Sequence, residues 1–282
     1  MTPGAKLKAR LANGPLVAPG AYDALTARIA AQVGAEAVYM TGFGVAGSYL
    51  GVPDIGIVSA TEMTDRVRAL AAAASPVPLI ADGDNGHGGT ANVERLVRAY
   101  EQAGAACIQL EDQVLPKRCG HMEGKEVVTL EEGAMKIRAA AAARATADFQ
   151  IIARTDARSI SGLDEALRRA DAYLNAGADI IFVEAPQSES ELRTIADRFK
   201  GVPLVANMVE DGKTPMLSVT DLGALGFRII LFPISSLLAA ARTAQRVYAG
   251  ILRTGTIDPT VERVTFSAYN EIVGLSSYLK SP

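Results

Sequence analysis

The stretch Gln102–Asp112, "QAGAACIQLED", contains the pattern that decides the fold. A helix-like segment ends at Gly104, and glycine suits the left-handed position at which helices commonly stop. A short apolar run follows, and it is continuous rather than alternating, as is typical of a parallel strand covered on both faces. The run closes on two acids, Glu111 and Asp112. The stretch therefore predicts a helix end, a turn and a buried strand with a polar end.

The same arrangement recurs along the chain. It returns as "QVGAEAVYMTG" at 32–42, "NAGADIIFVEA" at 175–185 and "ALGFRIILFP" at 224–233, and further apolar runs lie at 14–20, 77–84, 149–157 and 202–208. Helical stretches, such as 90–103 and 161–176, separate these eight strands. Eight strands alternating with helices predict a closed (β/α)8 barrel, the TIM-barrel architecture. A doubly wound open sheet is the alternative, although no Gly-rich dinucleotide loop follows the first run.

Composition limits the class of protein. The chain has 282 residues, 21% of them charged, and a net charge of −3 with both signs interspersed, so we expect one domain over 1–282 and neither a nucleic-acid nor a membrane partner. No apolar run approaches the roughly 20 residues that span a bilayer, and the first residues lack the apolar core of a secretion signal. The two cysteines, Cys107 and Cys119, make no disulfide framework, so a cytoplasmic location is expected.

Polar side chains gather where the predicted strands end. In a (β/α)8 barrel the carboxyl ends of the strands meet at one mouth, which is where active sites lie. We therefore expect the strand-end side chains to face one common site. They are Tyr39, Thr41, Gly42, Asp54, Asp82, Asp84, Glu111, Asp112, Arg154, Asp156, Glu184 and Asn207.

Four of the acids in this list follow three adjacent strands and are expected to surround one small volume. Asp82, Asp84 and Glu111, with Asp54 nearby, would repel one another unless a divalent cation neutralised them. Ligands that are all oxygen favour Mg²⁺, or Mn²⁺. The alternative is that the acids cap the helices that follow.

Arg154 directly follows the apolar run "QIIA", so a buried strand would deliver its guanidinium to the mouth. A forked donor is suited to hold a carboxylate at two points, which predicts a small anionic substrate. The alternative is an internal ion pair with Glu184 or Asp156. Glu184 and Asn207 could equally be ordinary hydrogen-bonding residues at strand ends.

The loop "PKRCGHMEGK", 116–125, is too polar to belong to the core. Its cations Lys117 and Arg118, with His121, would lower the pKa of the Cys119 thiol, which could then act as a nucleophile or as a general acid. Gly120 and Gly124 would allow the loop to close over a substrate. Cys107 lies in an apolar run and is expected in the core, while His87 in "DNGHGG" is expected to be structural or peripheral.

Several of these segments together resemble the isocitrate lyase/phosphoenolpyruvate mutase superfamily. "KRCGH" at 117–121, following "LED", matches the signature of its carbon–carbon lyases, and "GSYLGVPDIG", "ADGDNGHGG", "IIARTDAR" and "VANMVEDGKTP" occur in the expected order. The similarity spans about 17–275. It is greatest to the 2,3-dimethylmalate lyase, petal-death and methylisocitrate-lyase-like types.

The resemblance implies roles for individual residues. Asp82, Asp84 and Glu111 would hold Mg²⁺ with Asp54 close by, and Tyr39, Thr41, Gly42 and Phe43 would receive the 2-oxyacid end of the substrate. Arg154, Glu184 and Asn207 would bind the other carboxylate. Cys119, on a movable loop with Lys117, Arg118, Gly120 and His121, would be the catalytic acid. The surplus helix in the tail 237–275 would be exchanged between the subunits of a tetramer.

The implied reaction is cleavage of a substituted malate between C2 and C3. A base near Tyr39 or Asp54 takes the hydroxyl proton, one half leaves as a 2-oxo acid, and Cys119 protonates the enediolate that remains. Oxaloacetate hydrolysis, methylisocitrate cleavage and carboxyphosphonoenolpyruvate- or phosphoenolpyruvate-mutase-type chemistry stay as alternatives for a di- or tricarboxylate substrate. The chain departs from many relatives at Asn85–Gly86–His87, and from methylisocitrate lyases in particular at "ANMVEDGKT".

Overall fold

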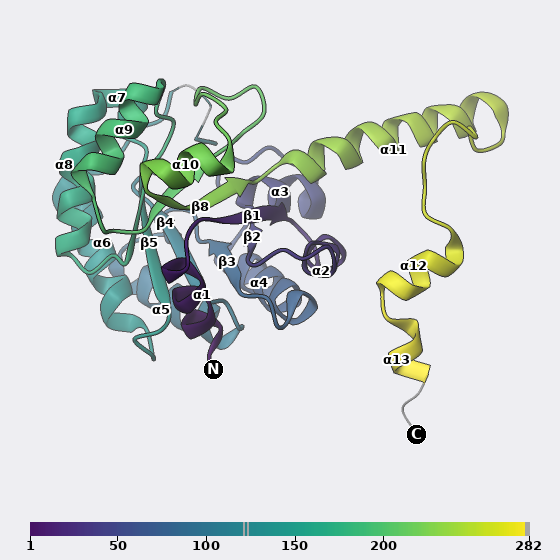
Figure 1. Ribbon diagram of the computed structural model, residues 1–282, viewed down its shortest axis with the longest axis horizontal. Coiled ribbons are helices and arrows are strands. Elements are labelled where there is room, and N and C mark those ends of the chain that lie inside the picture. Colours follow the sequence, from purple (N-terminus) through teal and green to yellow (C-terminus); the bar gives the residue numbers. More distant parts are fainter. Residues whose placement is uncertain (121, 123, 280–282) are drawn as a thin grey trace. The chain divides into compact units, whose positions relative to one another are not determined.

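Eight parallel strands close into a barrel in the computed structural model, which describes residues 1–120, 122 and 124–279 (Figure 1). Each strand pairs with its sequence neighbours, and β8 pairs with β1 to complete the ring. The strands are β1 Leu16–Ala21, β2 Val38–Met40, β3 Leu79–Asp82, β4 Cys107–Glu111, β5 Gln150–Thr155, β6 Ile180–Val183, β7 Leu204–Asn207 and β8 Phe227–Phe232. The predicted (β/α)8 barrel is confirmed, and the open-sheet alternative is wrong.

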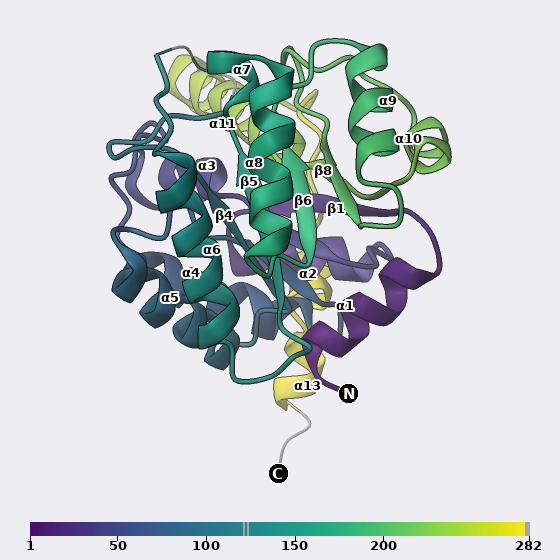
Figure 2. The ribbon, with the colours of Figure 1, turned by 90° about the vertical axis from the view of Figure 1, so that its left-hand side faces the viewer.

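Helices lie outside the ring of strands (Figure 2). Within Met1–Ile234 they are α1 Pro3–Ala12, α2 Ala24–Gln32, α3 Gly42–Val45, the π-helical turn η1 Ala46–Leu50, α4 Ala60–Ala74, α5 Thr90–Gln102, α6 Leu130–Ala143, α7 Arg158–Ser161, α8 Leu163–Asn175, α9 Glu189–Arg198 and α10 Val219–Leu225. The helices expected at 90–103 and 161–176 correspond to α5 and α8. The helices α1 and η1 were not predicted from the sequence.

The recurring glycine marks the end of a helix each time, as predicted. Gly34, Gly104, Gly177 and Gly226 follow α2, α5, α8 and α10, with φ values between 95° and 120°. A side chain is strained in this left-handed region, whereas glycine enters it freely. The turn then leads directly into β2, β4, β6 or β8.

Strand alternation decides which side chains face the mouth. Along β4, Cys107 belongs to the cluster of apolar residues inside the barrel, whereas Ile108 and Leu110 pack in the outer core between strands and helices. Because successive side chains point to opposite faces, Gln109 and Glu111 share the inward direction of Cys107, and Asp112 takes the outward one. Cys107 is fully buried, as expected.

Two compact units divide the chain, Met1–Ile234 and Ser235–Pro282. The second unit contains α11 Ser235–Thr254, α12 Phe266–Ile272 and α13 Leu275–Leu279. Several of its large apolar side chains are exposed in the single chain, among them Tyr248, Leu252, Phe266 and Tyr278. None of the helices among the described residues combines the length and the apolar character needed to cross a membrane.

Candidate active site

A cavity with about 520 Å³ of empty space, including the part open to solvent, lies at the carboxyl ends of the strands, inside the first unit. Its lining brings together most of the site residues expected from the sequence. These are Tyr39, Thr41, Phe43, Asp54, Asp82, Glu111, Lys117, Cys119, Gly120, Arg154, Glu184 and Asn207. Three apolar residues that the sequence analysis missed, Val209, Pro233 and Ile234, complete the wall.

The remaining expected residues have different positions. Gly42 and Asp84 lie directly behind the lining, because each donates its main-chain N–H to a carboxylate oxygen of Asp82 at 3.1 Å. Arg118 is not part of the cavity wall. Its main-chain N–H and carbonyl are both held by the side-chain amide of Gln113, at 2.9 and 2.8 Å. His121 lies outside the described residues.

The four acids at the mouth are buried close together. A Cβ atom on Gly42 would lie 2.8 Å from Asp82 Oδ2, so only glycine fits against these acids without displacement. Burial, with the charge of Asp84, raises the pKa of Asp82 to about 6, and burial also raises the pKa of Asp54. None of the four acids is the N-cap residue of a helix, since Thr41, Ser59 and Gly89 take those positions for α3, α4 and α5. The helix-capping alternative is therefore wrong.

Lys117 extends from the cysteine-bearing loop into this acidic cluster. Its Nζ lies 2.7 Å from Asp54 Oδ1 and 2.6 Å from Asp84 Oδ1, and its side chain is almost fully buried. Burial alone would lower the pKa of Lys117, but the surrounding carboxylates raise it well above its usual value. The ammonium therefore stays charged and neutralises part of the cluster.

The donor set at the mouth fits a hard divalent cation. The ligands would be carboxylate oxygens, and Glu111 Oε1 is buried with no hydrogen-bond partner within the described part of the chain. Burial raises the pKa of Glu111 well above its usual value, as expected for an acid whose charge is incompletely compensated. Among the same described residues, no three acidic, histidine or cysteine side chains converge into a ready-made metal site. Mg²⁺ keeps several waters when it binds and commonly takes few carboxylates from the protein.

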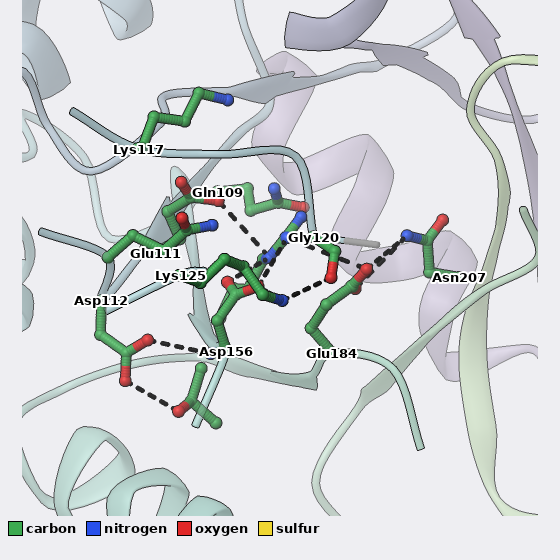
Figure 3. Close-up of polar contacts among 12 residues, drawn as sticks. Gln109, Glu111, Asp112, Lys117, Gly120, Lys125, Asp156, Glu184 and Asn207 are labelled. Atoms are coloured by element: carbon green, nitrogen blue, oxygen red, sulfur yellow. Dashed lines mark hydrogen bonds and ion pairs between the residues drawn. The ribbon is translucent and has the colours of Figure 1, made fainter. Parts of the chain in front are cut away.

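Arg154 lies on the strand next to Glu111, with its guanidinium over the ring of Phe182. Its Nε and Nη2 donate to the two oxygens of Asp156 at 3.0 and 3.1 Å, and it lies within ion-pair distance of Glu111 and Glu184. The internal pair considered from the sequence is thus present, and Arg154 also reaches the cavity. The neighbouring Asn207 Nδ2 donates to Glu184 at 3.2 Å, while Asn207 Oδ1 is buried without a partner in the described structure (Figure 3).

The loop segment that carries Cys119 packs tightly against Arg154. Cys119 is half-buried and lines the cavity. A Cβ atom on Gly120 would come within 2.2 Å of Arg154 Nη2 and 2.5 Å of Glu184 Oε1. Lys125, which the sequence analysis did not single out, donates to the carbonyl of Gly120 and lies 2.8 Å from Asp156 Oδ1 (Figure 3). The absence of a side chain at 120 therefore permits this close approach.

Tyr39 points into the barrel beside the acids. Its hydroxyl donates to Gln109 Oε1 at 3.2 Å. Burial, followed by the charge of Asp82, raises the pKa of Tyr39 well above 10. The phenol is therefore a neutral hydrogen-bonding group rather than a base at ordinary pH. The inward alternation along β4 is the signal that could have identified Gln109 from the sequence.

Two polar residues near the mouth face away from the cavity. Asp112 accepts hydrogen bonds from Thr155, Arg169 and Tyr173 and from the main chain of Asp156, so it is a buried structural anchor. His87 is absent from the main cavity and lines a separate one beside α4 and α5, with its Nε2 3.8 Å from Asp84 Oδ2. This position agrees with the peripheral role expected for it.

Comparisons with known proteins identify close relatives over nearly the whole chain. The family model described as phosphoenolpyruvate phosphomutase matches residues 7–252. The 2,3-dimethylmalate lyase of Eubacterium barkeri is 47% identical over 277 residues, covering 98% of this chain and 95% of that protein.

Solved structures agree with this similarity. An oxaloacetate acetylhydrolase in complex with 3,3-difluorooxalacetate has a TM-score of 0.95 and 36% identity, covering 99% of this chain and 95% of that one. A phosphonopyruvate hydrolase in complex with oxalate and Mg²⁺ has a TM-score of 0.88 and 35% identity, covering 99% and 97%.

Proposed function

This chain belongs to the phosphoenolpyruvate mutase/isocitrate lyase superfamily, as a carbon–carbon lyase, and we propose that it is a Mg²⁺-dependent enzyme that cleaves 2-alkylmalates such as 2,3-dimethylmalate. The products are a 2-oxo acid, pyruvate in this case, and a carboxylate. One observation carries the proposal: a single cavity is lined by the buried acids Asp54, Asp82 and Glu111 together with Arg154 and Cys119. This lining suits a substrate with a 2-hydroxy acid at one end and a second carboxylate at the other.

The two ends of the substrate are held by different groups. The guanidinium of Arg154, with Asn207 and Glu184 beside it, binds the carboxylate next to C3. Thr41, Gly42 and Phe43, with the neutral hydroxyl of Tyr39, receive the 2-hydroxy acid end. Lys117 and Arg118 hold the cysteine-bearing segment over the substrate, and we propose substrate-binding roles for Gly120 and His121 as well.

Asp82, with Asp84 and Glu111, would hold Mg²⁺, or Mn²⁺. When bound, the cation would polarise the hydroxyl and carboxylate oxygens of the substrate and favour loss of the hydroxyl proton. The orphaned oxygen of Glu111 and the raised pKa values of the buried acids support a cation at this place.

The chain's own residues carry the proton transfers. Asp54 lines the cavity and accepts the hydroxyl proton, because Tyr39 is held in its neutral form. As the C2–C3 bond breaks, its electron pair moves to C3 and into the adjoining carboxylate, where Arg154 stabilises the developing charge. The Cys119 thiol then donates its proton to C3, which gives the carboxylate product and a thiolate.

The apolar wall favours an alkyl substituent at C3 over a third carboxylate. Phe43, Val209, Pro233 and Ile234 line the cavity, and within its described lining the cations are Lys117 and Arg154. Lys117 is already paired with Asp54 and Asp84, so a tricarboxylate such as methylisocitrate would leave one charge without a cation. We therefore expect methylisocitrate to bind less well than the alkylmalates.

Oxaloacetate hydrolysis is the second candidate, favoured by the structural similarity to an oxaloacetate acetylhydrolase. The deciding experiment follows pyruvate release from racemic 2,3-dimethylmalate with Mg²⁺, with and without EDTA, through coupled lactate dehydrogenase. Oxalate release from oxaloacetate is measured in parallel. Pyruvate formation that EDTA abolishes is the expected result. Oxalate without pyruvate would replace the proposal with the hydrolase. Phosphorus NMR with phosphonopyruvate tests the mutase alternative.

We also propose that the protein is a tetramer in which α11–α13 pack on a neighbouring subunit. The exposed apolar side chains of this unit, including Leu252 and Phe266, support a covered position in an assembly. Light scattering coupled to size-exclusion chromatography should give the mass of four chains, and the mass of one chain would contradict the assembly.

A further inference from the structure

A chain of polar contacts connects the segment carrying Cys119 to the substrate-facing Arg154, and it passes through Lys125. The Lys125 side chain is 2% exposed. Its ammonium donates to Asp156 Oδ1 at 2.8 Å and to the main-chain carbonyl of Gly120 (Figure 3). Gly120 directly follows Cys119 in the sequence, so this contact fixes the carbonyl of the residue next to the one that carries the thiol.

Asp156 connects both cations in the interior. Its carboxylate accepts from Arg154 Nε and Nη2 at 3.0 and 3.1 Å, while its main-chain N–H donates to Asp112 Oδ1 at 2.9 Å. Although burial raises the pKa of Asp156, Arg154 and Lys125 hold it well below its usual range. The carboxylate is therefore charged at ordinary pH. It pairs with Arg154, which lines the cavity, and with Lys125, which contacts the loop.

The fit at Gly120 leaves little freedom for this segment. A Cβ atom at this position would meet both Arg154 and Glu184, so the backbone lies directly on the groups assigned to the substrate carboxylate. We propose that Lys125 is a positioning residue, which holds the Gly120 carbonyl against Asp156 and so places Cys119 for proton transfer beside the carboxylate bound by Arg154. This inference rests on the proposed catalytic role of Cys119.

A purely structural lysine would behave differently from a positioning one. Removing a structural ion pair lowers stability but leaves the thiol's environment in the folded enzyme unchanged. Removing a positioning group frees the segment next to Cys119 while Arg154 keeps its bonds to Asp156. We therefore expect a loss in kcat with little change in KM, together with a more reactive Cys119.

The test measures alkylation of Cys119 by iodoacetamide in the full-length protein, without substrate, for wild type and Lys125→Met. Rates are followed by peptide mass spectrometry between pH 7 and 9.5. The pH dependence of the rate reports the pKa of the thiol, and the plateau at high pH gives the limiting alkylation rate of the thiolate. Cys119→Ser gives the background. Lys6→Met is the matched control, because Lys6 also donates to a main-chain carbonyl, that of Pro76, away from the cavity lining.

We expect the limiting alkylation rate to rise about tenfold in Lys125→Met, the scale of losing one hydrogen bond to a charged group. For 2,3-dimethylmalate, kcat should fall at least tenfold and KM should stay within about threefold. Lys6→Met should match wild type. Unchanged alkylation in folded Lys125→Met, or an equal rise in Lys6→Met, would overturn the assignment.

Lys125→Arg protects the test against misfolding, since it keeps a cation beside Asp156. Its broader planar fork should displace the Gly120 carbonyl, so we expect alkylation between wild type and Lys125→Met. If Lys125→Met fails to fold, Lys125→Arg decides alone, and a rate equal to wild type rejects the proposal. Because alkylation requires no turnover, a failure of dimethylmalate cleavage would remove the proposed reaction and leave the positioning result standing.

Discussion

The ammonium of Lys117 lies 2.6 Å from Asp84 Oδ1, so the loop carrying Cys119 is tied directly to the acids at the barrel mouth. Lys117 and Cys119 are two positions apart in the sequence, and both line the cavity. Arg154 and Lys125 approach the same loop at Gly120. The position of the thiol thus depends on charge pairs at both ends of a short segment.

Lys117→Met should destabilise the protein strongly. The substitution leaves Asp54 and Asp84 buried without their cation, and breaking a buried ion pair typically costs about 3–5 kcal/mol. Thermal unfolding followed by circular dichroism should show a clear decrease in the apparent Tm. Arg68→Met, which removes an exposed pair with Asp65, should change the Tm very little. Equal effects in the two variants would contradict the buried pairing.

Cys119→Ser should lower kcat for 2,3-dimethylmalate by about 10²–10⁴-fold, because a hydroxyl is a far weaker acid than a thiol. KM should change little, since the carboxylate and hydroxyl contacts remain. Pyruvate release measures both constants. Cys107→Ala, inside the barrel and away from the cavity, is the matched thiol control and should keep kcat within about twofold. A Cys119→Ser enzyme with normal turnover would exclude the thiol as the acid.

Gly120→Ala should reduce kcat/KM by about 10–100-fold. Its Cβ would lie 2.2 Å from Arg154 Nη2, so either the loop or the guanidinium must move, and small misplacements are costly in active sites. Gly89→Ala is the control, because a Cβ there meets nothing within 4 Å. Steady-state kinetics on both variants makes the comparison. Similar kinetics for wild type and Gly120→Ala would show that the close approach of Gly120 to Arg154 does not affect catalysis.

Tyr39→Phe should reduce kcat without moving either limb of the pH–rate profile. Burial holds the pKa of Tyr39 well above 10, so the phenol stays protonated and uncharged from about pH 6 to 10. Its loss removes one hydrogen-bond donor, worth roughly tenfold in rate. Profiles of kcat/KM over this range provide the measurement. The disappearance of an alkaline limb in Tyr39→Phe would mean that the phenol titrates during catalysis.

The repeated helix-end glycine and the continuous apolar runs predicted the barrel because both are local signals. Gly104 takes the left-handed turn that the pattern requires, and β4 follows it. The position of the site could also be predicted from the sequence, since parallel strands in a closed barrel end at one mouth. Asp82, Glu111 and Arg154 all line the cavity for that reason.

The local sequence did not determine which polar side chains pair with one another. Glu111 and Asp112 are adjacent, yet strand alternation turns one into the cavity and the other towards Arg169 and Tyr173. The sequence indicated that Lys117 and Arg118 would surround the thiol. The structure instead pairs Lys117 with acids from two other loops, and Gln113 holds the main chain of Arg118.

Local patterns in the amino-acid sequence thus specify the barrel, its mouth and the types of group gathered there. Only the tertiary structure decided that Lys125 reaches Asp156 and Gly120, and that Val209, Pro233 and Ile234 form the apolar wall. The cause is the distance along the chain over which each interaction acts. Periodicity and glycine conformation act within a few residues, whereas a buried charge takes as its partner whichever opposite charge or carbonyl the folded strands bring within about 3 Å.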